Sequence, residues 1–199
     1  MSDARPGRPR AFDADAALEK AMLVFWGQGY EGAGLTDLTE AMGISRKSLY
    51  AAYGNKEDLF RKVLRAYEEG PASYVVQALR APTAREVAAV FLASSARSST
   101  LPGCPAGCLG VQGALAVGEN GRVAHDTLAE WRAGGQELLR ERFQRAVDEG
   151  DLPADASPDL IARYVMTFAN GIAVQAAGGA SGEDLRRVAH AALRNWPPA

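Results

Sequence analysis

The sequence predicts an all-α protein, in which an N-terminal unit of three helices precedes a larger helical domain, with about nine helices altogether. Apolar residues recur at three- and four-residue spacing through most of the chain, as they do on one face of an amphipathic helix. Helix-starting residues such as Ser45, Asn55 and Ser157 precede several of these segments, and glycine often follows them. We place the domain boundary after residue 54, which gives domains 1–54 and 55–199.

The composition predicts a folded chain with a locally basic surface. The 199 residues are 47% hydrophobic and carry a net charge of only −2, so bulk charge does not indicate a polyanion-binding protein. Basic residues are nevertheless concentrated, because residues 45–65 hold six of them against two acidic ones, a local charge of +4. Residues 1–10 hold three arginines against one aspartate. Such a local basic surface is typical of nucleic-acid binding.

The sequence contains no recognisable targeting signal. No run approaches the roughly 18 apolar residues that span a bilayer, and the N-terminus lacks the apolar region of a secretory signal. Two cysteines do not make a disulfide framework. We therefore expect a cytoplasmic protein with no membrane partner.

The first two helices are predicted from their caps. Asp13 can cap a helix that runs to about Trp26, with Met22 and Phe25 on its apolar side. Glycines then interrupt regular structure, but they match no phosphate-binding pattern. Thr36 is the expected cap of the second helix, and its hydroxyl group could also contact a DNA phosphate.

A tight turn at residues 43–45 is expected to join the second helix to a third over Arg46–Tyr53. Gly43 can adopt the left-handed conformation that ends a helix, and Ser45 can cap the next one. Ile44 and Leu49 occupy the positions where an apolar contact fixes the angle between the turn and the helix. The pattern therefore predicts a helix-turn-helix.

Polar side chains at the start of the third helix are expected to point outward. Cations, hydroxyl groups and an aromatic hydroxyl on a short helix suit a DNA major groove. These residues are Arg46, Lys47, Ser48 and Tyr50.

Residues 1–11 are expected to form an arm rather than a helix, because they include two prolines. Its arginines, Arg8 and Arg10 among them, could lie in the minor groove, where arginine is favoured. The alternative is a solvated tail.

The fourth helix has a clear start. Gly54 ends the third helix and Asn55 caps the fourth, with two acidic residues in its first turn. Capping explains Lys56 less well than a phosphate contact does, and an ordinary exposed lysine is the alternative.

Residues 13–62 resemble the N-terminal domain of the TetR/AcrR family of transcriptional regulators. The matching stretch reads LTDLTEAMGISRKSLYAAYGNKEDLF, with intact spacing across the turn and into the fourth helix. The resemblance implies an all-helical protein whose three N-terminal helices bind DNA and whose divergent helical domain binds small molecules and dimerises. It also implies that the positions that commonly contact DNA are Thr36, Ser45, Arg46, Lys47, Ser48, Tyr50, Tyr53 and Lys56.

Two positions depart from that family pattern. Many members have glycine where this chain has Lys47, and histidine where it has Ala52. The lysine adds a candidate base or phosphate contact, whereas the alanine removes a phosphate contact.

Six further helical segments are expected in the larger domain. Gly70-Pro71 should interrupt the fourth helix, after which a short helical stretch spans Ala72–Arg80. Thr83 and Glu86 form a capping box at the start of the next helix. The remaining segments are a short helix over about 107–117, a long one over 122–149, one from Pro158 to about Ala177, and a last one through 185–196.

Cys104 and Cys108 lie in a loop rich in glycine and proline, and three interpretations are open. They could be small packing residues. They could sense oxidants or electrophiles if a thiol is exposed and has a lowered pKa. A metal site is the weakest interpretation, since the only histidines are His125 and His190.

The last two helices carry small and apolar residues on more than one side, which favours a four-helix interface between two copies. A homodimer also suits a palindromic site, because one short helix recognises few bases. An intramolecular core is the alternative. The candidate interface residues are Tyr164, Phe168, Ile172, Leu185, Val188, Ala192 and Trp196.

Taken together, these features predict a DNA-binding transcriptional regulator, a repressor that a small-molecule effector releases from a palindromic operator. A thiol-based redox regulator triggered through Cys104 or Cys108 is the alternative. No catalytic motif indicates an enzyme, and no cofactor or metal is expected. The candidate effector-pocket residues are Tyr67, Tyr74, Phe91, Cys108, Gln112, Trp131, Phe168, Asn170 and Gln175.

Overall fold

The computed structural model describes residues 12–194, 196 and 197, and within them every regular element is a helix. Ten α-helices and one 3-10 helix are present in this part of the chain, where the sequence predicted about nine helices. The all-α prediction is therefore confirmed. None of these helices is long and apolar enough to cross a membrane. The predicted arm residues Arg8 and Arg10 lie outside the described residues.

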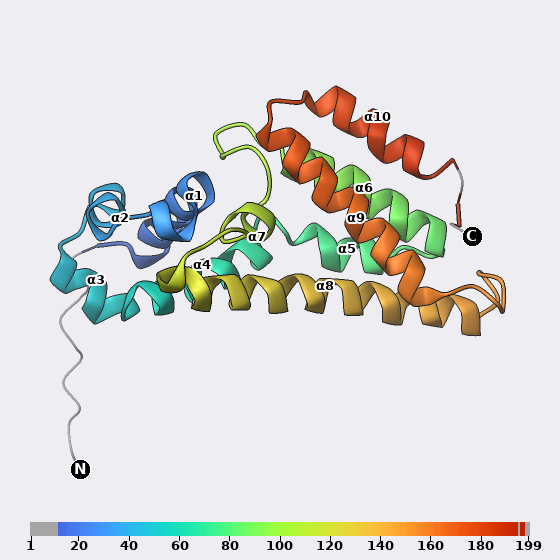
Figure 1. Cartoon of the computed structure of the whole chain (residues 1–199), viewed down its shortest axis with the longest axis horizontal. Coiled ribbons are helices and arrows are strands. Elements are labelled where there is room, and N and C mark those ends of the chain that lie inside the picture. The colour runs from blue at the N-terminus through green and yellow to red at the C-terminus, as the bar shows by residue number, and fades with distance from the viewer. Residues whose placement is uncertain (1–11, 195, 198–199) are drawn as a thin grey trace, which may run out of the picture.

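Four helices build the N-terminal end of the molecule (Figure 1). They are α1 (Ala14–Gly32), α2 (Leu35–Met42), α3 (Arg46–Tyr53) and α4 (Lys56–Glu69). The predicted bounds of α3 are confirmed, and Asn55 caps α4 by accepting a hydrogen bond from the Asp58 amide at 2.9 Å.

Two predicted helix ends were wrong. The first helix continues past Trp26 to Gly32, because Gly29 adopts a φ of 71° and kinks the helix without ending it. Gly34, not Thr36, caps α2, and the Asp37 carboxylate accepts a hydrogen bond from the Gly34 amide at 3.0 Å. A glycine at this position is tolerated because the aspartate satisfies the open backbone donor.

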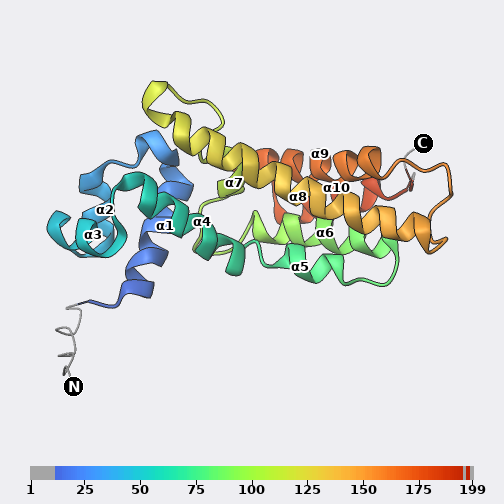
Figure 2. The same cartoon turned by 90° about the horizontal axis from the view of Figure 1, so that it is seen from below.

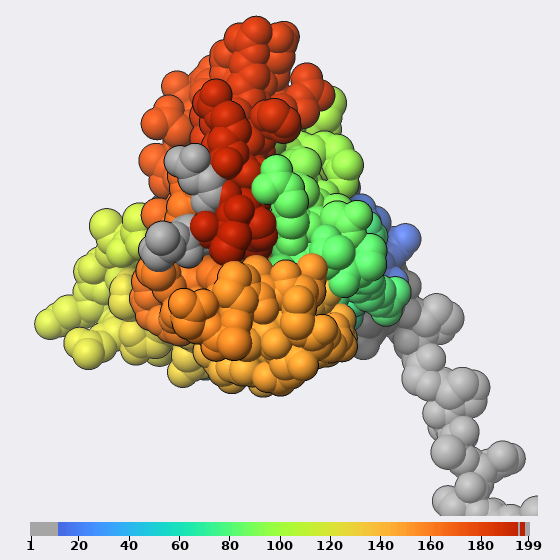
Figure 3. Space-filling model, turned by 90° about the vertical axis from the view of Figure 1, so that its right-hand side faces the viewer, coloured from blue at the N-terminus to red at the C-terminus, as the bar shows by residue number. Residues whose placement is uncertain are grey.

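The remaining helices form an elongated bundle, in which α8 runs from the N-terminal helices to the far end (Figures 1 and 2). Ser157 caps α9 and Thr83 caps α6, as the sequence predicted. The segments are α5 (Tyr74–Leu79), α6 (Ala84–Ser98), α7 (Leu109–Gln112), the 3-10 helix η1 (Glu119–Gly121), α8 (Arg122–Asp148), α9 (Pro158–Ala177) and α10 (Gly182–Ala192). The α7 helix is shorter than predicted, and Figure 3 shows α10, in red, beside the green α5–α6 region.

Two hydrophobic cores hold the molecule together, and they do not divide at residue 54. The first core joins buried residues of α1 to α4 with Leu109 of α7 and Leu128 of α8, both 0% exposed. The second core lies between α5, α6, α9, α10 and the far half of α8. The fourth helix and α7 therefore share the first core with α1, α2 and α3.

A buried arginine ties α8 to the turn between α5 and α6. Arg142 is only 5% exposed, and its guanidinium donates hydrogen bonds to the carbonyl oxygens of Leu79, Ala81 and Pro82 at 3.2, 2.8 and 3.0 Å. A charged donor makes a stronger hydrogen bond than a neutral one. Arg142 therefore holds α8 against the turn that joins α5 to α6.

Replacing Arg142 with methionine should lower the free energy of unfolding by about 2–4 kcal/mol, because three carbonyl oxygens lose the charged donor that this buried side chain supplies. Urea denaturation measures this loss. Arg145→Met is the control, since the Arg145 side chain is 57% exposed and its Glu149 partner lies at the surface. Equal stability of the two variants would contradict the role of Arg142.

Candidate functional site

The turn between α2 and α3 is built by backbone and cap hydrogen bonds. Gly43 adopts a φ of 68°, and its amide donates to the Glu40 carbonyl at 3.1 Å. The Ser45 hydroxyl then accepts a hydrogen bond from the Ser48 amide at 3.1 Å, which starts α3. This turn confirms the predicted helix-turn-helix and fixes the direction of α3.

The two sides of α3 differ sharply in burial. Leu49 is 0% exposed in the first core, whereas Tyr50 is 50% exposed. Ser45, Arg46 and Lys47 are also exposed, and Ser48 is half-buried with its hydroxyl 3.0 Å from that of Ser45. The exposed side of α3 thus carries donors, acceptors and positive charge, which are the groups that recognise base edges and phosphates.

Arg46 and Thr36 lie together at the surface. The guanidinium of Arg46 donates a hydrogen bond to the Thr36 hydroxyl at 2.9 Å, although the two residues belong to different helices. The contact brings the start of α2 beside the exposed side of α3. Thr36 therefore has the surface position that a phosphate contact requires, although it does not cap the helix.

Tyr53 does not have the predicted position for a DNA contact. It is 5% exposed, and its hydroxyl donates a hydrogen bond to the Ala14 carbonyl at 2.6 Å. The side chain faces the first core because it lies one turn after Leu49 on the same side of α3. Tyr53 joins α3 to α1.

Lys56 is held against an aromatic ring. Its ammonium nitrogen lies 4.5 Å from the centre of the Tyr30 ring, a cation–π contact. Burial lowers the pKa of Lys56, and nearby Glu31 acts in the opposite direction. The side chain is half-buried, so a phosphate contact would have to share it with Tyr30.

Sequence reasoning missed a lysine that caps the end of α3. The Lys62 ammonium donates hydrogen bonds to the carbonyl oxygens of Tyr53 at 2.8 Å and Ala52 at 3.4 Å. A cation is favourable at a helix C-terminus, where carbonyl groups lack partners. The cluster of basic residues was visible in the sequence, but the packing of α4 beside α3 was not.

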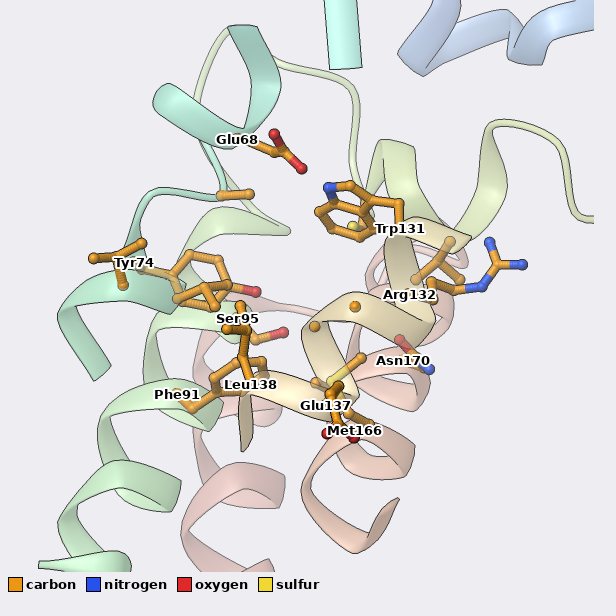
Figure 4. Close-up of a pocket in the computed structure, with 18 of the residues that line it drawn as sticks. Glu68, Tyr74, Phe91, Ser95, Trp131, Arg132, Glu137, Leu138, Met166 and Asn170 are labelled. Atoms are coloured by element: carbon orange, nitrogen blue, oxygen red, sulfur yellow. The ribbon is translucent and has the colours of Figure 1, made fainter. Parts of the chain in front are cut away.

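A cavity of about 610 Å³ lies between α5, α6, α7, α8 and α9, where the two cores meet (Figure 4). Five of the predicted pocket residues line it, namely Tyr74, Phe91, Cys108, Trp131 and Asn170. Cavities of this size are typical of small-molecule sites.

Four other predicted pocket residues lie outside the lining. Tyr67 is buried behind Cys108, and its hydroxyl donates to the Cys108 sulfur at 3.2 Å. The Gln112 amide turns toward α1 and the preceding loop, where it donates to the Ala106 carbonyl at 3.0 Å. Phe168 packs on Tyr164, with ring centres 4.8 Å apart, and Gln175 is exposed near the end of α9.

The cavity wall is mainly apolar, with neutral polar groups in its interior. Burial raises the pKa of the Tyr74 hydroxyl and of the Cys108 thiol, so both are protonated at neutral pH. Charged lining residues are more exposed, among them Glu68 and Glu137. The lining residues that sequence reasoning missed include Glu68, Ser95, Arg132, Glu137, Leu138, Glu141 and Met166.

Several predicted interface residues belong to the core of the single chain. Ile172, Leu185 and Ala192 are at most 3% exposed and pack in the second core, so they offer no surface to another copy. The Tyr164 hydroxyl donates to the Ala192 carbonyl at 2.5 Å. Trp196 packs beside Phe143 and Phe168 beside Tyr164, whereas Val188 is 42% exposed.

No group of three or more potential metal ligands occurs among the described residues. Cys104 and Cys108 are free thiols, each half-buried.

Comparison with known proteins assigns the family. Residues 17–63 match the family model for bacterial regulatory proteins of the tetR family, and residues 82–192 match the tetracyclin repressor-like C-terminal domain. The chain is 34% identical to the HTH-type transcriptional repressor ComR of Escherichia coli K12, over 96% of this chain and 92% of that one. The chain belongs to the TetR family.

Other relatives agree with this assignment. A cysteine mutant of the TetR family regulator CifR, complexed with 26-base-pair double-strand operator DNA, is 43% identical with a TM-score of 0.91, over 96% of this chain and 100% of that one. The repressor BdcR of Escherichia coli K12 is 26% identical, over 90% and 87% of the two chains. As a TetR-family protein, the chain is a DNA-binding transcription regulator and not an enzyme.

Replacing Lys47 with alanine should weaken operator binding about tenfold without unfolding the protein, because its side chain is exposed beside Tyr50. Fluorescence anisotropy with labelled operator DNA at several salt concentrations measures the change. If Lys47 contacts a phosphate, the slope of log affinity against log salt concentration should become shallower by about one. Arg80→Ala, on the exposed turn after α5, is the control, and equal affinities of the two variants would contradict the contact.

Proposed function

We propose that this TetR-family protein is a ligand-responsive repressor that binds a palindromic operator as a homodimer and is released by a small molecule. The exposed polar side of α3, fixed by the Gly43–Ser45 turn, is the observation that carries the proposal. The separate cavity supplies a place for the effector. A cytoplasmic location fits a protein that acts on operator DNA.

We assign separate roles to the exposed residues of the helix-turn-helix. Lys47 and Tyr50 are exposed on α3 and would contact base edges. Ser45, Ser48 and Arg46 would contact bases or adjacent phosphates, with Thr36 and Lys56 as phosphate contacts. The N-terminal arginines Arg8 and Arg10 would follow the minor groove.

A short physical path connects the cavity with these helices. Cys108, at the start of α7, lines the cavity and accepts the hydrogen bond of Tyr67 from α4. At the other end of α7, the Gly113 carbonyl accepts a hydrogen bond from the Tyr30 amide at 2.7 Å, beside the kink in α1. A ligand that displaces α7 would therefore act on α1 and α4 together, and both pack against the helix-turn-helix.

The dimer surface requires mostly different residues from those that the sequence suggested, and Val188 is common to both sets. On the outer side of α9, Leu160 and Val174 are 44% and 56% exposed, and Gly171 has open space above it. Val188 of α10 is 42% exposed. Exposed apolar and small residues on adjacent helices favour helix pairing between two copies. We propose this surface as the homodimer interface.

Operator binding tests the proposed function directly. Fluorescence anisotropy with the intergenic DNA beside the gene should show saturable binding of two chains per site, far tighter than binding to a random duplex of equal length. Equal affinity for both duplexes would contradict a specific regulator.

Replacing Val174 with glutamate should convert the homodimer to monomers and weaken operator binding at least tenfold, because it places a charge in the proposed interface. Analytical ultracentrifugation gives the mass. Val90→Glu is the control, since Val90 is 40% exposed on α6. If the Val174→Glu protein remained dimeric, the homodimer interface would not lie on this surface.

The thiol alternative remains testable, and the burial of Cys108 argues against it. A reactive cysteine requires the thiolate, whereas burial raises the pKa of Cys108, only partly opposed by the Tyr67 hydrogen bond. Cys104 is half-buried in the same loop.

At pH 7, alkylation of Cys108 by iodoacetamide should be slower than that of free cysteine, because the raised pKa leaves less thiolate. The rate should continue to increase at pH values where free cysteine has reached its plateau. Mass spectrometry of the Cys104→Ser variant isolates the Cys108 signal. Rapid alkylation at pH 7, together with oxidant-dependent DNA release that Cys108→Ser abolishes, would support the thiol alternative instead.

A further inference from the structure

Two adjacent glycines lie in the middle of α8, and packing does not explain them. Gly134 and Gly135 lie within a 27-residue helix, where glycine is a poor helix former. A Cβ atom added at either position would meet no atom within 4 Å among the described residues. Gly110 differs, because a Cβ there would collide with the Trp131 ring. The helix therefore leaves open space at these glycines.

This open space belongs to the cavity. Both glycines line it, as do Tyr74 of α5 and Phe91 of α6, which Figure 4 labels. Tyr74 and Phe91 pack edge to face, with ring centres 5.6 Å apart. A molecule in the cavity can thus lie between an aromatic wall and the bare backbone of α8.

The charged groups around the cavity are already engaged or lie in water. The Arg132 guanidinium donates to the Gly110 carbonyl at 2.6 Å and points away from the cavity in Figure 4. The Glu137 carboxylate is paired with Arg140 at 2.6 Å, and Glu68 and Glu141 are exposed. No buried charge therefore faces the interior from the described lining.

The interior offers neutral polar groups instead. The Ser95 side chain is 4% exposed, and Tyr74 and Cys108 keep their protons because they are buried. The Asn170 amide also lies on the wall, at the α9 side. Hydroxyl, thiol and amide groups can each exchange one hydrogen bond with a neutral ligand.

We propose that the cavity binds an uncharged, largely apolar molecule that lies against the α8 backbone at Gly134 and Gly135. A charged ligand would lose its hydration without finding a buried counter-ion, which is costly in an apolar site. Exposed carboxylates at the rim would attract a cation only weakly through water and would repel an anion. The proposal rests on the proposed function in one respect only, because it takes this ligand to be the effector.

Three naphthalene probes of nearly equal shape test the charge of the ligand. Calorimetric titration of the DNA-free, full-length protein at pH 7 compares 2-naphthylmethanol, 2-naphthoate and 2-naphthylmethylammonium. The alcohol should bind roughly tenfold or more tightly than either ion. Tighter binding of an ion, or no binding of the alcohol up to its solubility limit, would overturn the proposal.

A leucine at position 135 tests the place of binding. Gly135→Leu should abolish binding of 2-naphthylmethanol, because the new side chain occupies the open space beside the helix. Leucine is a better helix former than glycine, so this variant should melt at a temperature equal to or above that of the wild type. The matched control is Ala133→Leu, since Ala133 is exposed on α8 and is not part of the cavity wall.

The two variants give separable outcomes. Loss of binding in Gly135→Leu with normal binding in Ala133→Leu supports the proposal, whereas undiminished binding in Gly135→Leu overturns it. Operator affinity is measured in parallel on both variants without probe. The same measurement is made on the wild type. If the proposed function is wrong, the wild type will also fail to bind operator DNA specifically, whether or not it binds the alcohol.

Discussion

The hydrophobic core shared by α1–α4, α7 and the start of α8 is the constraint on which the rest of the structure depends. Leu38 and Leu49 hold the helix-turn-helix in this core, and Leu109 and Leu128 bring the larger domain into it, all four at 0% exposure. Because interiors pack densely, a shift of α7 cannot be absorbed locally. The backbone hydrogen bond from Tyr30 to Gly113 adds a fixed connection at the same place. The DNA-binding end and the cavity are therefore parts of one packed unit.

The fold could be predicted from the sequence wherever a helix end is decided by local chemistry. Ser45, Asn55, Thr83 and Ser157 cap helices as expected, because each side chain accepts a hydrogen bond from an amide only three residues away. The errors arose where tertiary contacts decide. The first helix continues through a kink at Gly29. The amide of the next residue, Tyr30, donates a hydrogen bond to the Gly113 carbonyl at the end of α7, and no local pattern indicates that contact.

The site was predicted in outline, and its detailed lining was not. The exposed residues of α3 followed from the spacing of Leu49 and its neighbours, but Tyr53 returns to the same buried side and serves α1. In the cavity, aromatic residues on α5, α6 and α8 were recognisable, whereas Tyr67 lies one layer behind Cys108. Most residues of the interface prediction turned out to pack in the core of the chain itself, whereas Val188 is exposed. Periodicity identifies an apolar side but does not identify what covers it.

The coupling between cavity and DNA is the central claim, and thermodynamic reciprocity gives its most direct test. If cavity occupancy weakens operator binding, then bound operator must weaken ligand binding by the same factor. The measurement is the affinity of 2-naphthylmethanol for the wild-type protein, free and saturated with operator DNA, at one salt concentration. We predict an affinity several-fold lower in the DNA complex, within the range of roughly 5–150-fold typical of allosteric proteins. Equal affinities in the two states would contradict the coupling through α7.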